Sequence, residues 1–569
     1  MEHLEQFIGF MNGLLAPVLV TALLGVGLIL TIRLGFIQIR KLGHGFAVTT
    51  GRYDDPDTPG DVSHFQALTT ALSATVGIGN IAGVAIAIHW GGPGALFWMW
   101  MTALLGMATK YSEVTLAQHF RQELRPDGKN WAGSVAGGPM YYIEHGLAKY
   151  GKKAAKYVAV FFACALMLTS FLTGNAIQAN TLATQMYHNF GVSTWITGLI
   201  TASLVGIVII GGIRRIGAVT GVLAPVMAFI YVLGALIIIF ANPNSIGHAF
   251  STIFSEAFNP SAGVAGTGVG VFLLTMQYGV QRGLFSNEAG QGSAPIAHSA
   301  AKTDEPVSEG VVALLEPFID TIIICTITGI VVVGTGVYNE RVETTLELND
   351  GNISFVEAGP DGGFTSTATP GSWQVANGEP VEAGGALLAY FDVPVDGLYT
   401  DEALTQPFSG TLLPSEARAE DASGQSYTTL YGRAVRSSSP LTTLAFERGM
   451  EPMGLGWLGR LIVLVCVILF ALSTAISWSY YGDRCAHYLF GEKAILPYKT
   501  VYVIMHFVGA TLAVTTIWDL GDVALSLVTI PNVIALLLLS GLVKQLTDSY
   551  FERRAWEKVT VKKKTGASV

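Results

Sequence analysis

The sequence is short of charge. Only 13% of its residues are Asp, Glu, Lys or Arg, and 51% are hydrophobic, whereas about a quarter of the residues of a soluble protein are charged. Nearly uncharged windows of about 20 residues recur along the chain, and this is the length that an α-helix needs to cross a bilayer. These features exclude a large soluble protein and indicate an all-α polytopic membrane protein.

Cysteine and the usual metal-binding motifs are scarce as well. The four cysteines (Cys164, Cys325, Cys466 and Cys485) lie in or at the ends of apolar stretches without metal-ligand spacing, so we expect small core residues. The eleven histidines include no His-Glu-x-x-His motif. Because no nucleophile–base pair or metal set stands out, the sequence predicts neither an enzyme nor an organic cofactor nor a nucleic-acid partner.

Eleven membrane spans are expected from the apolar windows. They cover residues 13–33, 65–90, 94–118, 156–182, 195–213, 216–240, 263–298, 309–336, 457–486, 498–517 and 521–544. Lys and Arg gather in alternate connections, while residues 91–93, 183–194, 241–262 and 518–520 contain none. Because basic residues stay on the cytoplasmic side, we expect the N-terminus outside the cell and the C-terminus in the cytoplasm. The expected location is a bacterial cytoplasmic (inner) membrane. The acidic start MEHLEQF does not resemble a cleaved signal peptide.

One long segment departs from this composition. Residues 337–456 contain short alternating runs such as GALLAYFDVPVDG, and between 338 and 448 there are sixteen Asp or Glu, five Arg and no Lys. We expect an acidic, β-rich insertion on the outer face. The predicted organisation is therefore a membrane domain in two parts, the insertion between them and a basic cytoplasmic tail: 1–336, 337–456, 457–546 and 547–569.

Two of the expected spans are interrupted. In residues 65–90, the stretch TVGIGN places Gly77, Gly79 and Asn80 within an apolar helix, and non-helical backbone at membrane depth must be buried by protein or line a cavity. We expect a second break in residues 263–298, with its unwound middle at 274–279. Five spans separate the two, so the second copy enters from the opposite face. Such pairs mark a transporter's binding site, here in one leading helix plus five-plus-five inverted repeats.

Several long motifs also resemble those of a known family. They are TVGIGNIAGVAIAI (75–88), GGPGALFWMWMTALLG (91–106), GGPMYYIEHGL (137–147), RGLFSNEAGQGSAPIAHSAAKT (282–303) and ALSTAISWSYYGDRC (471–485). They resemble the alanine/glycine:cation symporter family, the sodium:alanine symporters of the amino acid–polyamine–organocation superfamily, across all but residues 337–456. The resemblance implies a leucine-transporter-like fold that imports small neutral amino acids, chiefly alanine and glycine, with co-transported sodium. We expect a functional monomer in the lipid bilayer.

The two breaks supply candidate substrate contacts. Backbone N–H groups of Ile78 and Gly79 are expected to bind the substrate carboxylate, with Gly77 permitting the turn and Asn80 beside it. Carbonyls in the second break, together with the Gln277 amide, are expected to accept from the amino group. The residues expected there are Leu274, Thr275, Met276, Gln277 and Gly279.

Sodium prefers hard oxygen ligands. By resemblance to the common sodium site of this fold, the carbonyls of Ser73 and Val76 would face the hydroxyls of Ser473 and Thr474. A single hydroxyl in a membrane helix usually bonds its own backbone, but two adjacent ones at the matching place favour a cation site. A weaker second site is expected at Thr75, Asn80 and Thr275, beside the substrate carboxylate.

Acidic residues inside the spans leave further interpretations open, since such groups are functional candidates by default. Glu316 and Asp320 stand four residues apart on one face, Glu113 lies in the third span, and Glu288 is expected to pair with Arg282 or to form an inner gate with it. Proton exchange at Asp320 would make the transporter proton-coupled. The sequence is also compatible with a channel, or with a membrane amino-acid sensor that uses the acidic insertion.

Overall fold

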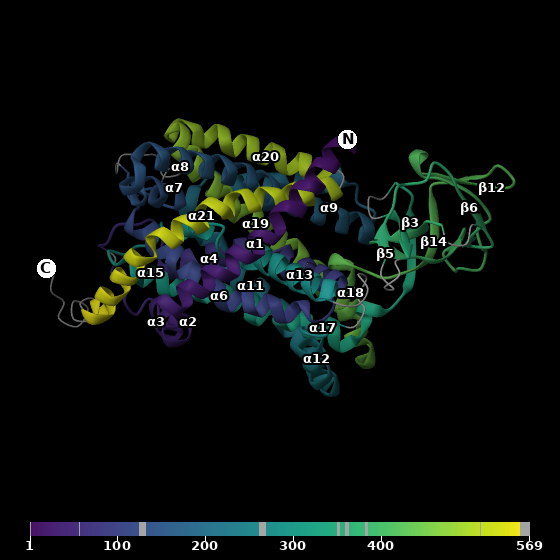
Figure 1. Cartoon of the computed structure of the whole chain (residues 1–569), viewed down its shortest axis with the longest axis horizontal. Helices are drawn as coiled ribbons and strands as arrows, with labels where there is room; N and C mark the ends of the chain where they lie inside the picture. Colours follow the sequence, from purple (N-terminus) through teal and green to yellow (C-terminus); the bar gives the residue numbers. More distant parts are fainter. Residues whose placement is uncertain are drawn as a thin grey trace.

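The computed structural model describes residues 2–55, 57–124, 133–260, 269–349, 353–358, 364–381, 385–511 and 514–557. Helices form a long body, and the strands gather at one end of it, apart from the short pair β1 (Gln122–Glu123) and β2 (Val135–Ala136) (Figure 1). The C-terminal end of α21 (Val514–Glu552) lies at the opposite end of the body (Figure 1).

Helices occupy each stretch where a span is expected. The main ones are α1 (Glu2–Arg33), α4 (His64–Thr75), α5 (Val84–Gly91), α6 (Ala95–His119), α8 (Ala148–Phe171), α9 (Ile177–Phe190), α10 (Thr194–Ile209), α11 (Gly212–Ala241), α13 (Val269–Asn287), α15 (Pro306–Ala313), α17 (Thr326–Thr335), α19 (Gly456–Phe490), α20 (Ile495–Thr511) and α21 (Val514–Glu552). Among the described residues, six helical segments are long and apolar enough to cross a membrane, or seven when one bent pair counts as a span. The count of eleven spans stays a prediction.

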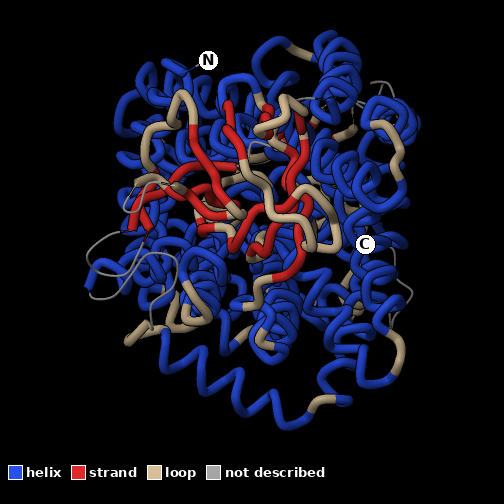
Figure 2. Tube along the Cα trace, turned by 90° about the vertical axis from the view of Figure 1, so that its right-hand side faces the viewer, coloured by secondary structure: helices blue, strands red, loops and turns tan. Residues whose placement is uncertain are grey.

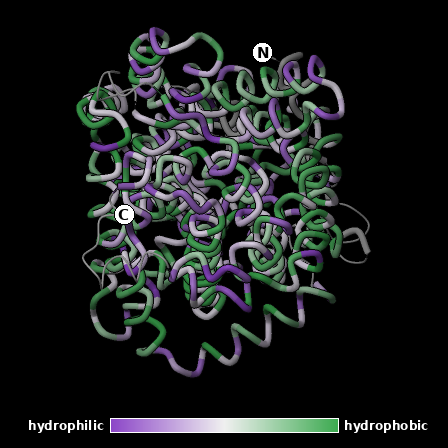
Figure 3. Tube along the Cα trace, turned by 90° about the vertical axis from the view of Figure 1, so that its left-hand side faces the viewer, coloured by the Kyte–Doolittle hydropathy of each residue, from purple (hydrophilic) through white to green (hydrophobic). Residues whose placement is uncertain are grey.

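Shorter elements connect these helices. They are α2 (Ile37–Arg40), α3 (Leu42–Thr49), α7 (Pro139–Tyr141), α12 (Pro243–Glu256), α14 (Ala294–His298), α16 (Leu315–Pro317) and α18 (Ser438–Met450), with the π-helical turns η1 (Gly79–Gly83), η2 (Tyr142–Gly146), η3 (Leu172–Ala176) and η4 (Phe318–Cys325) and the short 3₁₀ turns η5 (Val337–Asn339), η6 (Pro414–Glu416), η7 (Glu451–Met453) and η8 (Glu492–Ala494). Many side chains on the outside of the helices are apolar. On α11, for example, Val222, Phe229 and Phe240 are all more than 60% exposed, which is typical of a surface that meets lipid. Figure 3 shows hydrophobic segments along the flanks of the helices.

The first expected break is confirmed. Helix α4 starts at a capping box in which Ser63 and Gln66 bond each other's backbone N–H, and it ends at Thr75. The chain resumes at η1 and continues into α5, and the two halves are bent by 51°. The two glycines and the asparagine of TVGIGN therefore mark the position of the break, as expected.

The second break is displaced from its expected position. Helix α13 runs without interruption from Val269 to Asn287, so the expected unwound stretch at 274–279 is wrong. The chain leaves the helix at Glu288, which has a positive φ of 55°, and passes through Gly290 and Gly292, also at positive φ, before α14 begins. The break therefore falls at SNEAGQGSAP, at the C-terminal end of the segment.

All described strands other than β1 and β2 lie between Val342 and Ala434, and Figure 2 shows them in front of the helices when the molecule is viewed from that end. They are β3 (Val342–Glu347), β4 (Ile353–Ala358), β5 (Phe364–Ser366), β6 (Trp373–Ala376), β7 (Glu379–Pro380), β8 (Leu387–Tyr390), β9 (Val393–Pro394), β10 (Asp396–Tyr399), β11 (Gly410–Leu413), β12 (Arg418–Asp421), β13 (Ser426–Tyr427) and β14 (Thr429–Ala434). They form sheets with the orders β10-β14-β3, β13-β12-β11-β6-β7 and β5-β4-β8-β9. The first and last strands pair directly, from Val342 opposite Ala434 to Glu347 opposite Thr429.

Two contacts join this strand segment (residues 342–434) and α18, which follows it, to the broken helix. The tip of the β8–β9 hairpin, Phe391 and Asp392, has positive φ at both positions, as in a two-residue hairpin turn, and the Phe391 carbonyl lies 3.0 Å from His89 Nε2 on α5. The Thr442 hydroxyl of α18 donates to the Ile81 carbonyl of η1 at 2.8 Å. The second half of the broken helix therefore has neighbours from this region.

Candidate functional site

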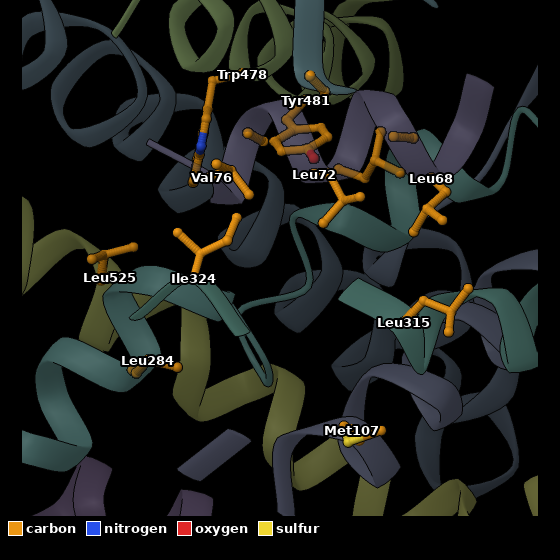
Figure 4. Packing of buried hydrophobic residues seen from close by; sticks show 14 of the residues in the cluster. Leu68, Leu72, Val76, Met107, Leu284, Leu315, Ile324, Trp478, Tyr481 and Leu525 are labelled. Atoms are coloured by element: carbon orange, nitrogen blue, oxygen red, sulfur yellow. The ribbon is translucent and has the colours of Figure 1, made fainter. Parts of the chain in front are cut away.

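A small cavity lies at the break between α4 and α5. The sequence analysis singled out five of its lining residues, Thr75, Gly77, Ile78, Gly79 and Thr474. Those that it missed as lining residues are Ala74, Thr173, Gln178, Phe285, Gln291, Trp478 and Leu525, together with Glu288, which it had marked only as an intramembrane acid. Figure 4 shows 14 buried side chains of the surrounding core and labels ten of them, among them Val76, Trp478 and Leu525, which come from segments far apart in sequence.

One wall of the cavity is suited to an anion. Ile78 and Gly79 open the second half of the broken helix, where first-turn N–H groups lack acceptors within the helix and the helix dipole favours negative charge. The Gly77 N–H donates to Asn80 Oδ1 at 2.8 Å, which holds the turn closed. A Cβ at Gly79 would lie 3.1 Å from the Phe285 ring, so glycine lets α13 pack closely against this turn.

Hydrogen-bond acceptors at the cavity come from the second break and from α9. Glu288 is buried, and its carboxylate accepts from Trp478 Nε1 at 2.9 Å and from the Ser293 hydroxyl. Gln178 and Gln291 each donate through Nε2 to a backbone carbonyl, while their buried Oε1 atoms have no hydrogen-bond partner in the described part of the chain. These oxygens can accept hydrogen bonds from an ammonium group. The cavity therefore has donors suited to a carboxylate and acceptors suited to an ammonium group, the two charged groups of a zwitterion.

Next to the cavity, α19 meets the end of α4. The Thr474 hydroxyl donates to the carbonyls of Ser73 at 3.2 Å and Ala74 at 3.3 Å, and the Ser473 hydroxyl lies 3.3 Å from the Ser73 carbonyl and 2.9 Å from that of Phe470. The structure thus brings together Ser73, Ser473 and Thr474 as expected. These oxygens are the hard ligands that sodium needs, and where no cation is bound the hydroxyls satisfy the carbonyls.

Val76 completes the expected set by position. It caps the end of α4, one residue before the break. A Cβ added to its neighbour Gly77 would lie 2.5 Å from Thr474 Oγ1. The backbone after Val76 therefore passes directly beside the Thr474 hydroxyl, and any side chain at Gly77 would push the two apart.

The weaker second cation site is not assembled. The Asn80 side-chain amide donates to Ser286 Oγ at 3.1 Å and to Asp320 Oδ1 at 2.6 Å, and the Thr75 hydroxyl donates to its own helix. Thr275 stands eleven residues before Ser286 on α13, about 16 Å along a helix that rises 1.5 Å per residue. That prediction is wrong, because it rested on an unwound segment near Thr275.

The expected amino-group contacts on α13 do not line the cavity either. They are Leu274, Thr275, Met276, Gln277 and Gly279. Gly279 serves close packing, since a Cβ there would lie 2.4 Å from the Ala95 carbonyl of α6. The neighbouring Tyr278 ring stacks on Trp90 of α5. The glycine in this stretch therefore marks a helix contact, and the cavity lies further along, at Phe285 and Glu288.

The expected Arg282–Glu288 pair does not form. Arg282 Nη2 instead donates to Asp522 Oδ2 on α21 at 2.6 Å, and its guanidinium lies over the Phe285 ring. Phe285 and Leu525, which line the cavity, follow Arg282 and Asp522 by three residues on their helices. The ion pair therefore lies one helical turn from the cavity wall on both sides, and we call it the Arg282–Asp522 clamp.

A buried charge network that the sequence analysis did not anticipate lies at the other ends of the broken helices. Lys110 Nζ lies 3.0 Å from Glu316, whose other oxygen is 3.5 Å from His298 Nε2. His298 Nδ1 bonds Glu309 at 2.6 Å, and Glu309 also bonds His64. All five side chains are buried. They join α4, α6, α14, α15 and α16, and of the five the sequence analysis had marked only Glu316, as an acid inside a span.

The two other acids that the sequence analysis marked are hydrogen-bonded. Asp320 accepts from Asn80, Ser286 and the Thr321 hydroxyl. One oxygen of Glu113 accepts from the Gly292 N–H at 3.0 Å and from the Asn532 amide at 2.5 Å, which holds the second break. Both acids thus have structural partners at the breaks.

Comparison with known proteins agrees with this architecture. The pattern of the family described as "Sodium:alanine symporter family" matches residues 1–356 and 427–564. The chain is 39% identical over 538 residues to "Sodium/alanine symporter AgcS" of Methanococcus maripaludis, which covers 95% of each chain. It is also 39% identical over 310 residues to "Amino-acid carrier protein AlsT" of Bacillus subtilis, covering 54% of this chain and 62% of that one.

A solved structure supports the expected fold. MhsT in complex with L-phenylalanine superposes with a TM-score of 0.50 at 13% identity, covering 84% of this chain and 89% of that one. At this identity the likeness concerns the fold alone, and it is to a leucine-transporter-like structure. The family match extends over most of the chain and confirms the resemblance read from the motifs. The chain therefore belongs to the sodium:alanine symporter family, a family of multi-pass membrane transporters.

Proposed function

We propose that the protein imports small neutral amino acids, alanine and glycine, together with sodium across a bacterial inner membrane. The observation that carries this proposal is the shared break: the turn at Gly77–Gly79 borders both the cavity and the oxygens of Ser73, Ser473 and Thr474. One local rearrangement can therefore respond to a cation and to a substrate at once. The N-terminus outside, the strand segment on the outer face, the cytoplasmic C-terminus and a monomeric unit are parts of the same proposal.

The mechanism follows from these positions. Sodium would draw the two hydroxyls and the carbonyls of α4 around itself and so order the end of that helix. The substrate carboxylate would then meet the N–H groups of Ile78 and Gly79, and its ammonium group would meet Glu288, Gln178 and Gln291. Alternating access requires one repeat to move against the other. Co-transport needs only a coupling free energy of roughly 1–3 kcal/mol between the two sites.

The walls of the cavity support the proposed preference for small side chains. Phe285, Trp478 and Leu525 fill the space beyond the polar contacts. A substrate with a long side chain would have to displace one of them, whereas glycine or alanine would not. The aromatic wall therefore supports the substrate class that the family resemblance implied.

Uptake into proteoliposomes tests the proposal directly. Radiolabelled alanine should accumulate above equilibrium under an inward sodium gradient and should not do so under a potassium gradient of the same size. Unlabelled glycine should compete for uptake. Failure of several small amino acids to accumulate under any gradient would contradict the proposed function, and substrate binding without uptake would point to a sensor.

Proton coupling remains the second candidate, and the buried network of His64, Glu309, His298 and Glu316 is the observation that favours it. Asp320 is less suited, since it is held by Asn80 and Ser286. Accumulation of alanine driven by a pH gradient alone, in sodium-free buffer, would support this second candidate over sodium coupling.

The Arg282–Asp522 clamp should act as a gate beside the cavity. Asp522→Asn should lower the rate of sodium-driven uptake roughly tenfold, because a charge-assisted hydrogen bond contributes about 1.5–3 kcal/mol. The reversed pair Arg282→Asp/Asp522→Arg should recover part of the rate. Arg554→Gln is the matched control, since it breaks an exposed pair with Glu557 just after the same helix. Equal rates for Asp522→Asn and the control would show that the clamp is not a gate.

A further inference from the structure

A second and larger cavity lies far from the transport site, where the end of α1 and the short helix α2 meet α21. Four basic residues line it, Arg33, Arg40, Lys41 and Lys544, together with apolar side chains such as Ile37 and Phe551. Helices α1 and α21 run side by side (Figure 1). We call this cavity the basic pocket.

The charges of the basic pocket are poorly balanced. Arg33 donates to Ser540 Oγ at 3.1 Å, Arg40 donates to the Gly35 carbonyl at 3.2 Å, and Lys41 Nζ lies 3.9 Å above the Phe551 ring. In the described ranges of the chain, none of these three makes an ion pair with a carboxylate, and only Lys544 does so, with Asp548 at 3.0 Å. Burial, and then the neighbouring Arg40, lower the pKa of Lys41. Asp548 also lines the pocket, so in the described part of the chain one carboxylate faces four basic side chains.

The residues after α21 are basic in composition as well, since Arg553, Arg554 and four lysines outnumber Glu557. The last twelve residues, KVTVKKKTGASV, contain four lysines and no Asp or Glu side chain. Like charges that lie close together repel one another, which costs free energy, and a bound ligand of opposite charge lowers that cost. An anionic ligand would remove that cost.

The surroundings of the basic pocket show what kind of anion fits. Ile32, Phe36 and Ile39 are 61%, 51% and 72% exposed beside it. Arg33 ends α1, and Lys544 stands where the last expected span ends, so both lie at the depth where basic side chains meet headgroups. The site thus combines a phosphate-sized cluster of donors with an exposed apolar strip leading towards the bilayer.

We propose that the basic pocket binds the phosphate of an anionic phospholipid, with the acyl chains lying along Ile32 and Ile39. Arginine can donate two parallel hydrogen bonds to phosphate oxygens. Arg33 and Arg40 therefore bind the phosphate directly, while Lys41 and Lys544 add positive charge that attracts it. Basic pockets between membrane helices are known to take such headgroups. The bound lipid fixes the first helix against the last one. This proposal does not depend on the transported substrate.

Lipid binding measured by native mass spectrometry of the purified full-length protein tests the proposal. Titration with phosphatidylglycerol should give a bound species, and phosphatidylcholine should not. The triple variant Arg33→Gln/Arg40→Gln/Lys41→Gln should bind phosphatidylglycerol roughly a hundredfold more weakly, at about a fivefold loss per basic residue. The matched control removes three exposed basic residues elsewhere, Lys149→Gln/Lys152→Gln/Lys153→Gln, and should bind like the wild type.

A second measurement keeps the result clear if the triple variant is unstable. Phosphatidylglycerol should raise the unfolding temperature of the wild type and of the control, and should raise that of Arg40→Gln less. Inorganic phosphate at the same concentration should have little effect. Equal binding by the triple variant and the wild type would overturn the proposal, and full stabilisation by inorganic phosphate would show a free-anion site instead of a lipid site.

Discussion

Thr474→Val should raise the sodium concentration needed for half-maximal alanine uptake by roughly ten- to a hundredfold. Valine keeps the shape of threonine but removes the hydroxyl, and a hydrogen-bonding group that contacts a charge contributes about 1.5–3 kcal/mol, which corresponds to this range of affinities. The effect should fall on sodium affinity first, because Thr474 contacts the carbonyls of Ser73 and Ala74. Initial uptake rates over a sodium titration in proteoliposomes measure it.

Two further variants of α19 distinguish an effect on cation binding from an effect on folding. Thr474→Ser keeps the hydroxyl and should stay within a few-fold of the wild type. Ser479→Ala removes a buried hydroxyl that donates only to the Ile476 carbonyl of its own helix, and should leave sodium affinity unchanged. A Thr474→Val protein with wild-type sodium dependence would exclude this hydroxyl as a ligand and would leave the carbonyls to account for any cation site.

Lys110→Met should destabilise the protein by about 3–5 kcal/mol, because removal of one partner leaves an uncompensated charge in a buried site. Lys110 and Glu316 are both fully buried, 3.0 Å apart. His298 is the remaining partner of Glu316, at 3.5 Å. We expect a marked fall in the unfolding temperature in detergent. Thermal unfolding monitored with a thiol-reactive fluorescent dye or by tryptophan fluorescence measures it.

The double variant Lys110→Met/Glu316→Gln should be more stable than Lys110→Met alone, since it removes both charges. Lys156→Met is the matched control, because Lys156 pairs with Glu144 at 2.8 Å on an exposed surface, where such a pair contributes about 0–1 kcal/mol. Similar unfolding temperatures for Lys110→Met and Lys156→Met would contradict the role assigned to the buried network.

The sequence predicted one break well and misplaced the other, for a physical reason. Near Gly77, two glycines, hydroxyls and an asparagine occur together, and the helix ends there. Around Gly279 the same residue types occur, but that glycine allows α13 to approach the Ala95 carbonyl of α6. Glycine weakens a membrane helix and also permits close packing, and only the neighbouring helix decides between the two outcomes.

Partners distant in sequence could not be predicted. Arg282 was expected to pair with Glu288, six residues away, but its carboxylate partner is Asp522. Gln178 and Leu525 line the cavity from α9 and α21, which carry no local sign of a binding site. The proximity of Ser473 and Thr474 to Ser73 was predicted correctly, since adjacent hydroxyls are a local signal and the family resemblance supplied the distant half. That these residues bind sodium stays a prediction.

The pairing of β3 with β14 has a consequence for the history of this chain. Val342 and Ala434 lie opposite each other, so the polypeptide leaves the helices and returns to them at neighbouring points. The family pattern is interrupted between residues 356 and 427, within that excursion. Because both ends of this segment are held side by side, a change in its length during evolution need not move the helices on either side of it.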